Sequence, residues 1–231
     1  QNKVLEQLEI YSDLIELEPK NQRYYLQKLD VLKELGLHKK AIKFINKTES
    51  TFGASNELLI EKKEVYVDSG NFLEAEKIIK SLIKKAPKNI KYYSQLASLY
   101  MQFSKYEKAI STYNKLLEIN PNNPAAILAL YKIYSNKGDR LQQEKYLLMV
   151  TENPIISLET KRELFYRLLK DNNNGAQDAL KQIVIKAINI YPEEALFNLI
   201  LGDISAKELK YEAAINYYNK SLRSSFVKDE Y

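Results

Sequence analysis

The chain has 231 residues, of which 45% are hydrophobic and 28% charged, a balance typical of a folded protein and too apolar for a disordered one. It has no cysteine, which excludes disulfides, thiolate metal sites and cysteine nucleophiles, and its one histidine makes a histidine zinc site or a serine–histidine triad implausible. Six glycines are too few for the many turns of an α/β or all-β fold, so long helices with short connections are favoured.

The first predicted element is a helix over residues 2–17, with the pattern of a second helix of a pair whose first helix is missing. After it the chain repeats itself, because Pro87 and Pro121 are 34 residues apart and Pro19 precedes Pro87 by twice that interval. We therefore predict one stack of units over residues 1–231. Its units are a partial one at 1–19, then 20–53, 54–87, 88–121, 122–155, 156–192 and 193–226.

Within each unit the pattern predicts two helices. In the unit 88–121, apolar residues recur at helical spacing before Ser104, and a second apolar face follows it before Asn120-Pro121. Small residues recur twelve positions before the end of several units, where two helices approach closely: Ala41, Ala75, Ala109 and Ala214. Seventeen positions before the end of a unit, glycine is favoured because a left-handed residue ends the first helix there. The residues at that register are Gly36, Gly70, Ser104, Gly138, Gly175 and Leu209.

The later units and the two ends depart from this pattern. The unit 156–192 is overlong, with a polar run over residues 172–174 at its turn. The last pair ends near Ser224, with Phe226 and Tyr231 still apolar and no polar capping helix after them. Because the chain also opens on Gln1 rather than methionine, we expect a fragment of a longer repeat protein, or ends that meet other chains.

At these residues the chain resembles the tetratricopeptide-repeat (TPR) family. The resemblance is carried best by Tyr93, Leu96, Ala97, Tyr100, Tyr106, Ala109, Tyr113 and Pro121, and by Leu201, Gly202, Tyr211, Ala214 and Tyr218. It implies an all-α, TPR-like α-solenoid of about six helical hairpins forming a right-handed superhelix. It also implies that the first helix of each pair lines a concave groove that receives a peptide.

The candidate binding residues in the first half of the chain are acidic. Glu57, Glu61, Glu64 and Asp68 follow spacings of four, three and four, which places them on one face of a single helix. Asp30 and Glu34 lie one turn apart on the preceding first helix. If these faces line the groove, it favours a partner segment that bears Lys or Arg and that binds less tightly in salt. The alternative is a solvated helix face with no partner.

The candidate groove residues further along are more neutral: Lys91, Gln95, Ser98, Met101, Gln102, Leu128 and Lys132. Met101 and Leu128 are candidates to seat an apolar anchor of a partner, although ordinary packing explains them as well. The predicted second helices carry exposed lysines, which fit a solvated face or, as the minor alternative, contact with an anionic surface.

The net charge of +5 is compatible with nucleic acid, but the lysines are spread along every helix, so we do not expect nucleic-acid binding. No apolar stretch approaches the roughly 20 residues that cross a bilayer. No Gly-rich phosphate loop, nucleophile elbow or metal cluster appears, so we expect no cofactor and no enzymatic activity.

The sequence thus predicts a non-catalytic scaffold that binds another protein or peptide. Two alternatives stay open: a regulatory or substrate-recruiting segment of a larger multidomain or envelope-associated protein, and a module that associates with itself end to end. Lys- and Asn-rich chains of this kind look like envelope-associated bacterial proteins, which favours the periplasm, while the absence of cysteine leaves the cytoplasm open.

Overall fold

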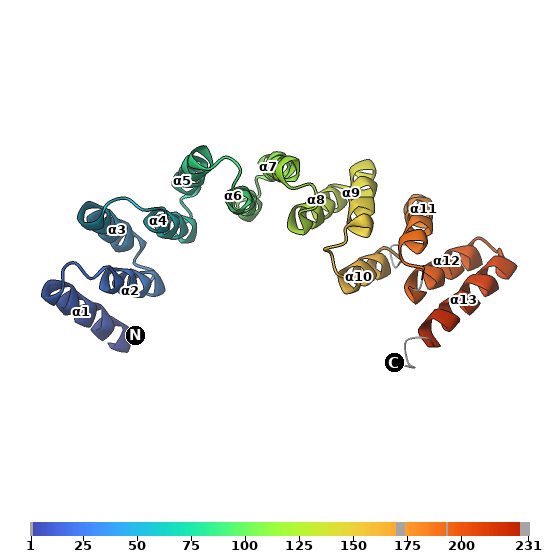
Figure 1. Ribbon diagram of the computed structural model, residues 1–231, viewed down its shortest axis with the longest axis horizontal. Helices are drawn as coiled ribbons and strands as arrows, with labels where there is room; N and C mark the ends of the chain where they lie inside the picture. The colour runs from blue at the N-terminus through green and yellow to red at the C-terminus, as the bar shows by residue number, and fades with distance from the viewer. Residues whose placement is uncertain (1, 170–173, 193, 227–231) are drawn as a thin grey trace. The chain divides into compact units, whose positions relative to one another are not determined.

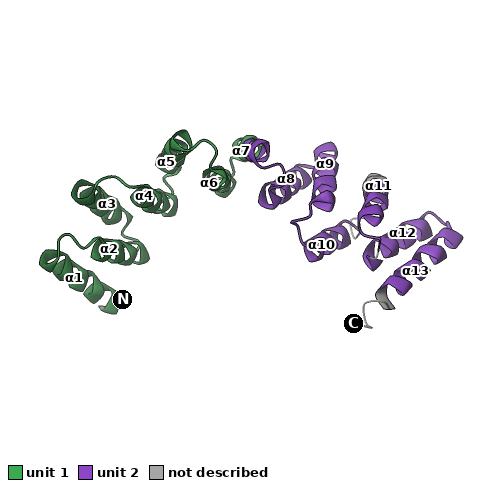
Figure 2. Cartoon of the chain, viewed as in Figure 1, with its two compact units in different colours: residues 1–112 green, residues 113–231 purple. Residues whose placement is uncertain are grey.

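The computed structural model describes residues 2–169, 174–192 and 194–226, and within these ranges it contains helices and short connections but no strand (Figure 1). The predicted all-α class is therefore confirmed for the described part of the chain. Asn172, Asn173 and Tyr231 lie outside those ranges. The chain divides into two compact units, 1–112 and 113–231, which are taken one at a time below (Figure 2).

In unit 1 each of the first five helices packs against the next one in the sequence. The seventh helix begins in unit 1 and ends in unit 2. These helices are α1 (Asn2–Leu17), α2 (Gln22–Glu34), α3 (His38–Phe52), α4 (Asn56–Asp68), α5 (Phe72–Lys85), α6 (Ile90–Gln102) and α7 (Tyr106–Ile119).

In unit 2 the helices α8 and α9 pack together, as do α11 and α12, and α12 and α13. Helix α11 also packs against α9, so two helices that are not neighbours in the sequence share a contact. The bounds are α8 (Pro124–Lys137), α9 (Arg140–Glu152), α10 (Leu158–Leu169), α11 (Asn174–Ile190), α12 (Ala195–Lys207) and α13 (Tyr211–Phe226).

The ends of the helices follow from local side-chain and backbone chemistry. Asn123 caps α8 by accepting a hydrogen bond from the Ala126 N–H, with Pro124 in the first turn, where it needs no donor. The chain leaves α8 through Gly138, whose φ of 68° is left-handed. Two residues at the same register of other units adopt this conformation without being glycine: Ser104 has φ 55° and Leu209 has φ 61°.

Small residues allow close helix contact in unit 1. Ala41 and Ala75 are fully buried, as predicted from their register. The cluster around Ala41 joins α2, α3 and α4 through these buried residues: Leu29, Leu32, Ala41, Ile45, Leu58 and Val65. Since α2 and α4 contribute to the same cluster, neighbouring pairs hold one another in place.

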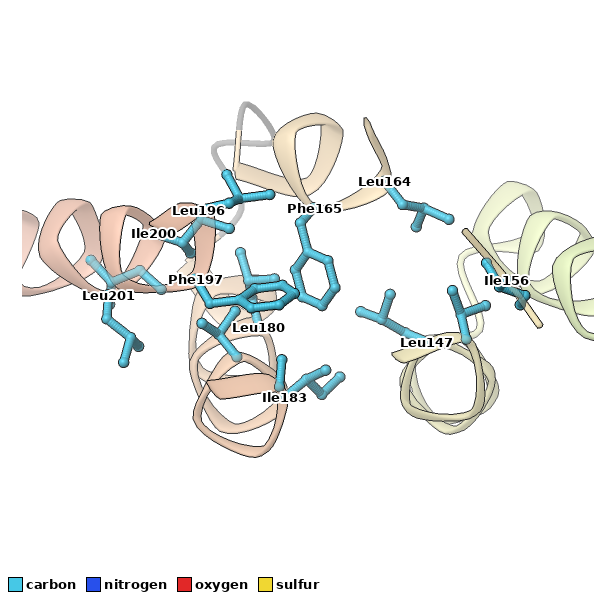
Figure 3. Packing of buried hydrophobic residues seen from close by; sticks show 14 of the residues in the cluster. Leu147, Ile156, Leu164, Phe165, Leu180, Ile183, Leu196, Phe197, Ile200 and Leu201 are labelled. Atoms are coloured by element: carbon cyan, nitrogen blue, oxygen red, sulfur yellow. The ribbon is translucent and has the colours of Figure 1, made fainter. Parts of the chain in front are cut away.

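Unit 2 has its own apolar cluster, which joins α8 to α12 (Figure 3). Its centre is an edge-to-face pair of phenylalanines, Phe165 on α10 and Phe197 on α12, with ring centroids 5.2 Å apart. Both side chains are fully buried, and Leu180 and Ile183 bring α11 into the same cluster. This cluster fixes α10, which bears residues of the second pocket described below.

Lys161 of α10 lies inside unit 2 and is 1% exposed. Its ammonium donates to the carbonyl oxygen of Asn153 at 2.7 Å and to the hydroxyl of Tyr191, and it lies 4.6 Å from the centroid of the Tyr191 ring. These contacts satisfy a buried cation with neutral oxygens and an aromatic face. Asn153 lies in the segment before α10 and Tyr191 in the segment after α11, so these contacts connect α10 to both segments.

Candidate functional site

The candidate site in unit 1 lies on the first helices of the pairs, α2, α4 and α6. Between α2 and α4 the Lys33 Nζ lies 2.6 Å from Glu61 Oε2, 3.6 Å from Glu64 Oε2 and 3.5 Å from Asp30 Oδ1. Burial by itself lowers the pKa of Lys33, but the hydrogen bond and charge of Glu61 raise it above its usual value, helped by the other two carboxylates. Three predicted acidic residues therefore meet around one cation.

This acidic cluster keeps a negative balance. The six predicted carboxylates and the two lysines that pair with them, Lys33 and Lys63, leave a net charge of −4. The Asp30 side chain is 70% exposed and that of Glu64 is 43% exposed. Glu34, Glu57 and Asp68 are exposed as well, so a cation arriving from solvent reaches several carboxylates without breaking the Lys33–Glu61 pair.

A pocket of about 330 Å³ continues this surface between α4 and α6. Four predicted residues come together on its α6 wall: Lys91, Gln95, Ser98 and Gln102. Lys63 and Val67 form the α4 wall, and Ile79 of α5 contributes an apolar side chain. A pocket with amide, hydroxyl and ammonium groups over an apolar side chain suits an extended peptide, whose backbone offers both donors and acceptors.

Gln95 contributes a polar atom that needs a partner. Its side-chain oxygen is buried and accepts no hydrogen bond from any residue that the structure describes. An unpaired buried acceptor costs about 1–3 kcal/mol, so rotation of the amide toward a donor entering the pocket would be favourable.

The remaining predicted residues do not join this pocket. Met101 of α6 is half-buried and is not among the residues that line it. Leu128 and Lys132 belong to unit 2, where they line another pocket, of about 340 Å³, together with Tyr131, Glu163 and Arg167. The structure thus groups the predicted residues other than Met101 into two separate sites, one in each unit.

Sequence reasoning missed several residues of these sites. Lys33 stands three residues after Asp30, and this spacing was the available signal that it shares a helix face with the acidic residues. Lys63 lies between the acidic positions of α4, and the spacing of the carboxylates did not point to it. Arg167 lies in the last turn of α10, and no repeat register pointed to it.

Two kinds of feature are absent from the described residues. No group of three or more His, Cys, Asp or Glu side chains there has the arrangement of a metal site. In the same ranges, no helix combines the length and the apolar character needed to cross a membrane.

Comparison with known proteins gives a family profile and several relatives. The Tetratricopeptide repeat profile matches residues 66–132, which include α5 and α6. A TPR repeat-containing protein of Methanocaldococcus jannaschii is 30% identical over 171 residues, covering 74% of this chain and 23% of that protein. A human protein O-mannosyl-transferase is 21% identical over 188 residues, covering 81% of this chain and 18% of its own length. The chain thus spans less than a quarter of either relative.

A solved structure agrees in fold. The C-terminal part of a TPR repeat-containing protein from Cytophaga hutchinsonii aligns with a TM-score of 0.57 and 17% identity. The alignment covers 96% of this chain and 90% of that one. At this identity the likeness concerns the fold alone, and it supports a helical solenoid.

Proposed function

Because the chain is a tetratricopeptide-repeat protein, we propose that it is a non-catalytic scaffold that binds a segment of a partner polypeptide on its first helices. TPR repeats generally mediate contacts between proteins. The observation that carries the proposal is the pocket between α4 and α6, where Gln95 has an unpaired buried oxygen and the acidic cluster lies on the neighbouring side of α4.

The charges on either side of α4 suggest how a segment would lie. A Lys or Arg side chain of the partner would reach the exposed carboxylates of Asp30 and Glu64. Carbonyl oxygens or an acidic side chain further along the segment would meet Lys91 at the pocket. Binding would then depend on salt, because exposed charge pairs are screened within about 8 Å at physiological ionic strength.

A peptide array compared across charge variants tests the acidic part of the proposal. In Glu64→Gln/Asp68→Asn the Lys33–Glu61 pair remains, and we expect capture of Lys/Arg-bearing peptides to fall by about tenfold, as loss of roughly 1.4 kcal/mol gives. The matched control is Glu6→Gln/Asp13→Asn, which removes the same two charges from exposed positions of α1. Equal capture by both variants would refute the role of the acidic cluster.

A second variant tests the pocket itself. Ser98 is exposed on the pocket wall, so Ser98→Trp is expected to fill the pocket without disturbing the core of unit 1. Peptides retained by the native chain should then be lost, while circular dichroism stays unchanged. If a helical Ser98→Trp chain still retained all of these peptides, the binding site would lie outside this pocket.

A regulatory or recruiting segment of a larger protein is the second candidate. The alignment that favours it is the one to the human O-mannosyl-transferase, whose matched region is 18% of its length. In that case the segment would deliver a bound polypeptide to an attached domain. Deleting residues 1–231 from the full-length protein would then reduce turnover of a protein substrate while leaving turnover of a short substrate unchanged. Equal loss with both substrates would count against recruitment.

Self-association is a third candidate because of one exposed stripe on α13. Tyr211, Ile215 and Leu222 are 62%, 59% and 57% exposed and lie on one helix face. Sedimentation at increasing concentration should detect a dimer that Ile215→Glu/Leu222→Glu abolishes. A native chain that stays monomeric throughout would exclude it.

A further inference from the structure

We propose that the pocket between α1, α2 and α3 is a second docking site, which binds an acidic amphipathic segment of a partner polypeptide. The pocket has a volume of about 560 Å³. Its apolar side chains come from all three helices: Leu8 of α1, Leu32 of α2 and Phe44 of α3. It is separate from the site proposed above. Lys28 and Leu32 line it from α2, and each is two residues from Asp30 of the acidic cluster, which places it about 200° away around the axis of α2.

The charge of this pocket is strongly positive. Lys28, Lys40, Lys43 and Lys47 line it with one carboxylate, that of Glu9, which leaves a net charge of +3. In the part of the chain that the structure describes, no carboxylate lies within 4 Å of these four ammonium groups. A large apolar surface surrounded by unpaired cations favours a ligand with apolar and anionic groups side by side.

Lys28 lines the pocket with a partly buried ammonium group. Its Nζ donates to Ser12 Oγ at 2.6 Å and lies 5.2 Å from the centroid of the Phe44 ring. Burial lowers the pKa of Lys28, and the positive charge of Lys47 lowers it further, against smaller opposing effects of Glu16 and Asp13. A carboxylate arriving beside Lys28 would relieve this unfavourable environment.

The next pair of helices provides an internal comparison. Lys62 stands 34 residues after Lys28, but its ammonium lies 3.1 Å from Glu49. Glu74 stands 34 residues after Lys40, so the lysine there is replaced by an acid, 3.9 Å from Lys77. Neighbouring carboxylates can therefore neutralise lysines at this register of the fold. The pocket between α1, α2 and α3 lacks such neutralisation.

The arrangement of the lysines favours a peptide over a single carboxylate or a lipid surface. Lys40, Lys43 and Lys47 follow helical spacing and span about 10 Å along α3. One fatty-acid headgroup would pair with only part of this row. Acidic side chains spaced by one turn on a bound helix would pair with all three, while apolar side chains next to them fill the pocket.

The test uses the whole chain and a fluorescein-labelled synthetic peptide of about 14 residues, long enough for the lysine row. The peptide carries a leucine stripe flanked by glutamates. Fluorescence anisotropy should detect binding that weakens with salt and that is lost when the glutamates become glutamine or the leucines become serine. Failure of the Leu/Glu peptide to bind, or equal binding of the glutamine peptide, would overturn the proposal.

Protein variants then locate the site. Lys43→Glu/Lys47→Glu should raise the Kd for the peptide by at least about tenfold. The matched control Lys88→Glu/Lys105→Glu makes the same charge change at exposed positions outside the helices and should leave the Kd nearly unchanged. Equal weakening by both variants would mean that net charge alone acts. A different outcome is that the chain binds phosphatidylglycerol vesicles and not the peptide, with this binding lost in Lys43→Glu/Lys47→Glu. That result would overturn the peptide proposal and identify the ligand as an anionic membrane surface.

Discussion

At the scale of single residues, the backbone at Leu209 stores strain that glycine would relieve. Its φ of 61° is left-handed, a conformation that costs a side-chain-bearing residue about 1–2 kcal/mol. The side chain is 70% exposed, so little packing is lost on removing it. After the entropy cost of glycine, of about 0.5–1 kcal/mol, we expect Leu209→Gly to raise the free energy of unfolding by up to about 1 kcal/mol.

Urea denaturation measures this change. Leu209→Ala is the control, because it removes the same side chain and keeps the strain, and it should bring no gain. Gly138→Ala should lower stability by a similar amount, since φ is 68° there. A gain from Leu209→Ala equal to that from Leu209→Gly would show that strain is not the cause.

The buried carboxylate of Glu76 makes the stability of unit 1 depend on pH. Burial alone would raise its pKa, but hydrogen bonds from Lys80, Tyr100 and Lys108 lower it from 4.5 to about 2. The unfolded chain therefore binds the proton first as the pH falls. The stabilisation that Glu76 contributes is fully present above pH 4.5 and is lost between pH 4.5 and about 2.

We expect Glu76→Gln to lower the free energy of unfolding at pH 7 by about 1–3 kcal/mol and to flatten its fall in acid. Thermal denaturation at a series of pH values provides the measurement. Glu74→Gln, at a more exposed position two residues away, should keep the native profile. An unchanged acid slope in Glu76→Gln would assign the pH dependence to other carboxylates.

At the scale of elements, the contact between α12 and α13 depends on a missing side chain. A Cβ at Gly202 would overlap the ring of Tyr218, whose hydroxyl donates to Asp203 Oδ1 at 2.9 Å. Alanine would favour the helix by up to about 1 kcal/mol. Because overpacking costs about 1–3 kcal/mol, we expect Gly202→Ala to destabilise the protein on balance.

A double-mutant cycle with Tyr218→Leu checks this contact. The smaller side chain should relieve the overlap, so that Gly202→Ala becomes neutral or stabilising in the Tyr218→Leu background. If Gly202→Ala changed the free energy of unfolding equally in both backgrounds, overlap with Tyr218 would not be the cause of the destabilisation.

The repeat register explains why much of the fold was predictable and why much of the site was not. The spacing of alanines and turn residues recurs along the chain, so local patterns predicted buried Ala41 and the left-handed turn at Gly138. The contact of Lys33 with Glu61 joins residues 28 positions apart and depends on how two helices pack. No periodic pattern in one sequence encodes such a contact.

At the scale of the whole molecule, each unit has its own apolar cluster. Phe197 is fully buried in the cluster of unit 2, and its replacement by alanine should cost about 3–5 kcal/mol. Because repeats are stabilised by their nearest neighbours, we expect hydrogen exchange to accelerate in α10, α11 and α12 while α2 to α4 stay protected.

Mass-resolved hydrogen exchange on native and Phe197→Ala chains makes this comparison. Phe197→Leu is the milder control, with an expected cost below about 1.5 kcal/mol. Equal acceleration in α2 to α4 would mean that the chain unfolds as one cooperative block.

The burial of Lys161 has a practical consequence for covalent labelling. An amine-acylating reagent needs access to the nitrogen, and this ammonium is enclosed by Asn153 and Tyr191 while most other lysines face solvent. We expect acetic anhydride to modify the exposed Lys145 and Lys186 within seconds to minutes and to reach Lys161 only when α10 opens. The acylation rate of this one side chain, measured by mass spectrometry, would therefore report the rate at which α10 opens in unit 2.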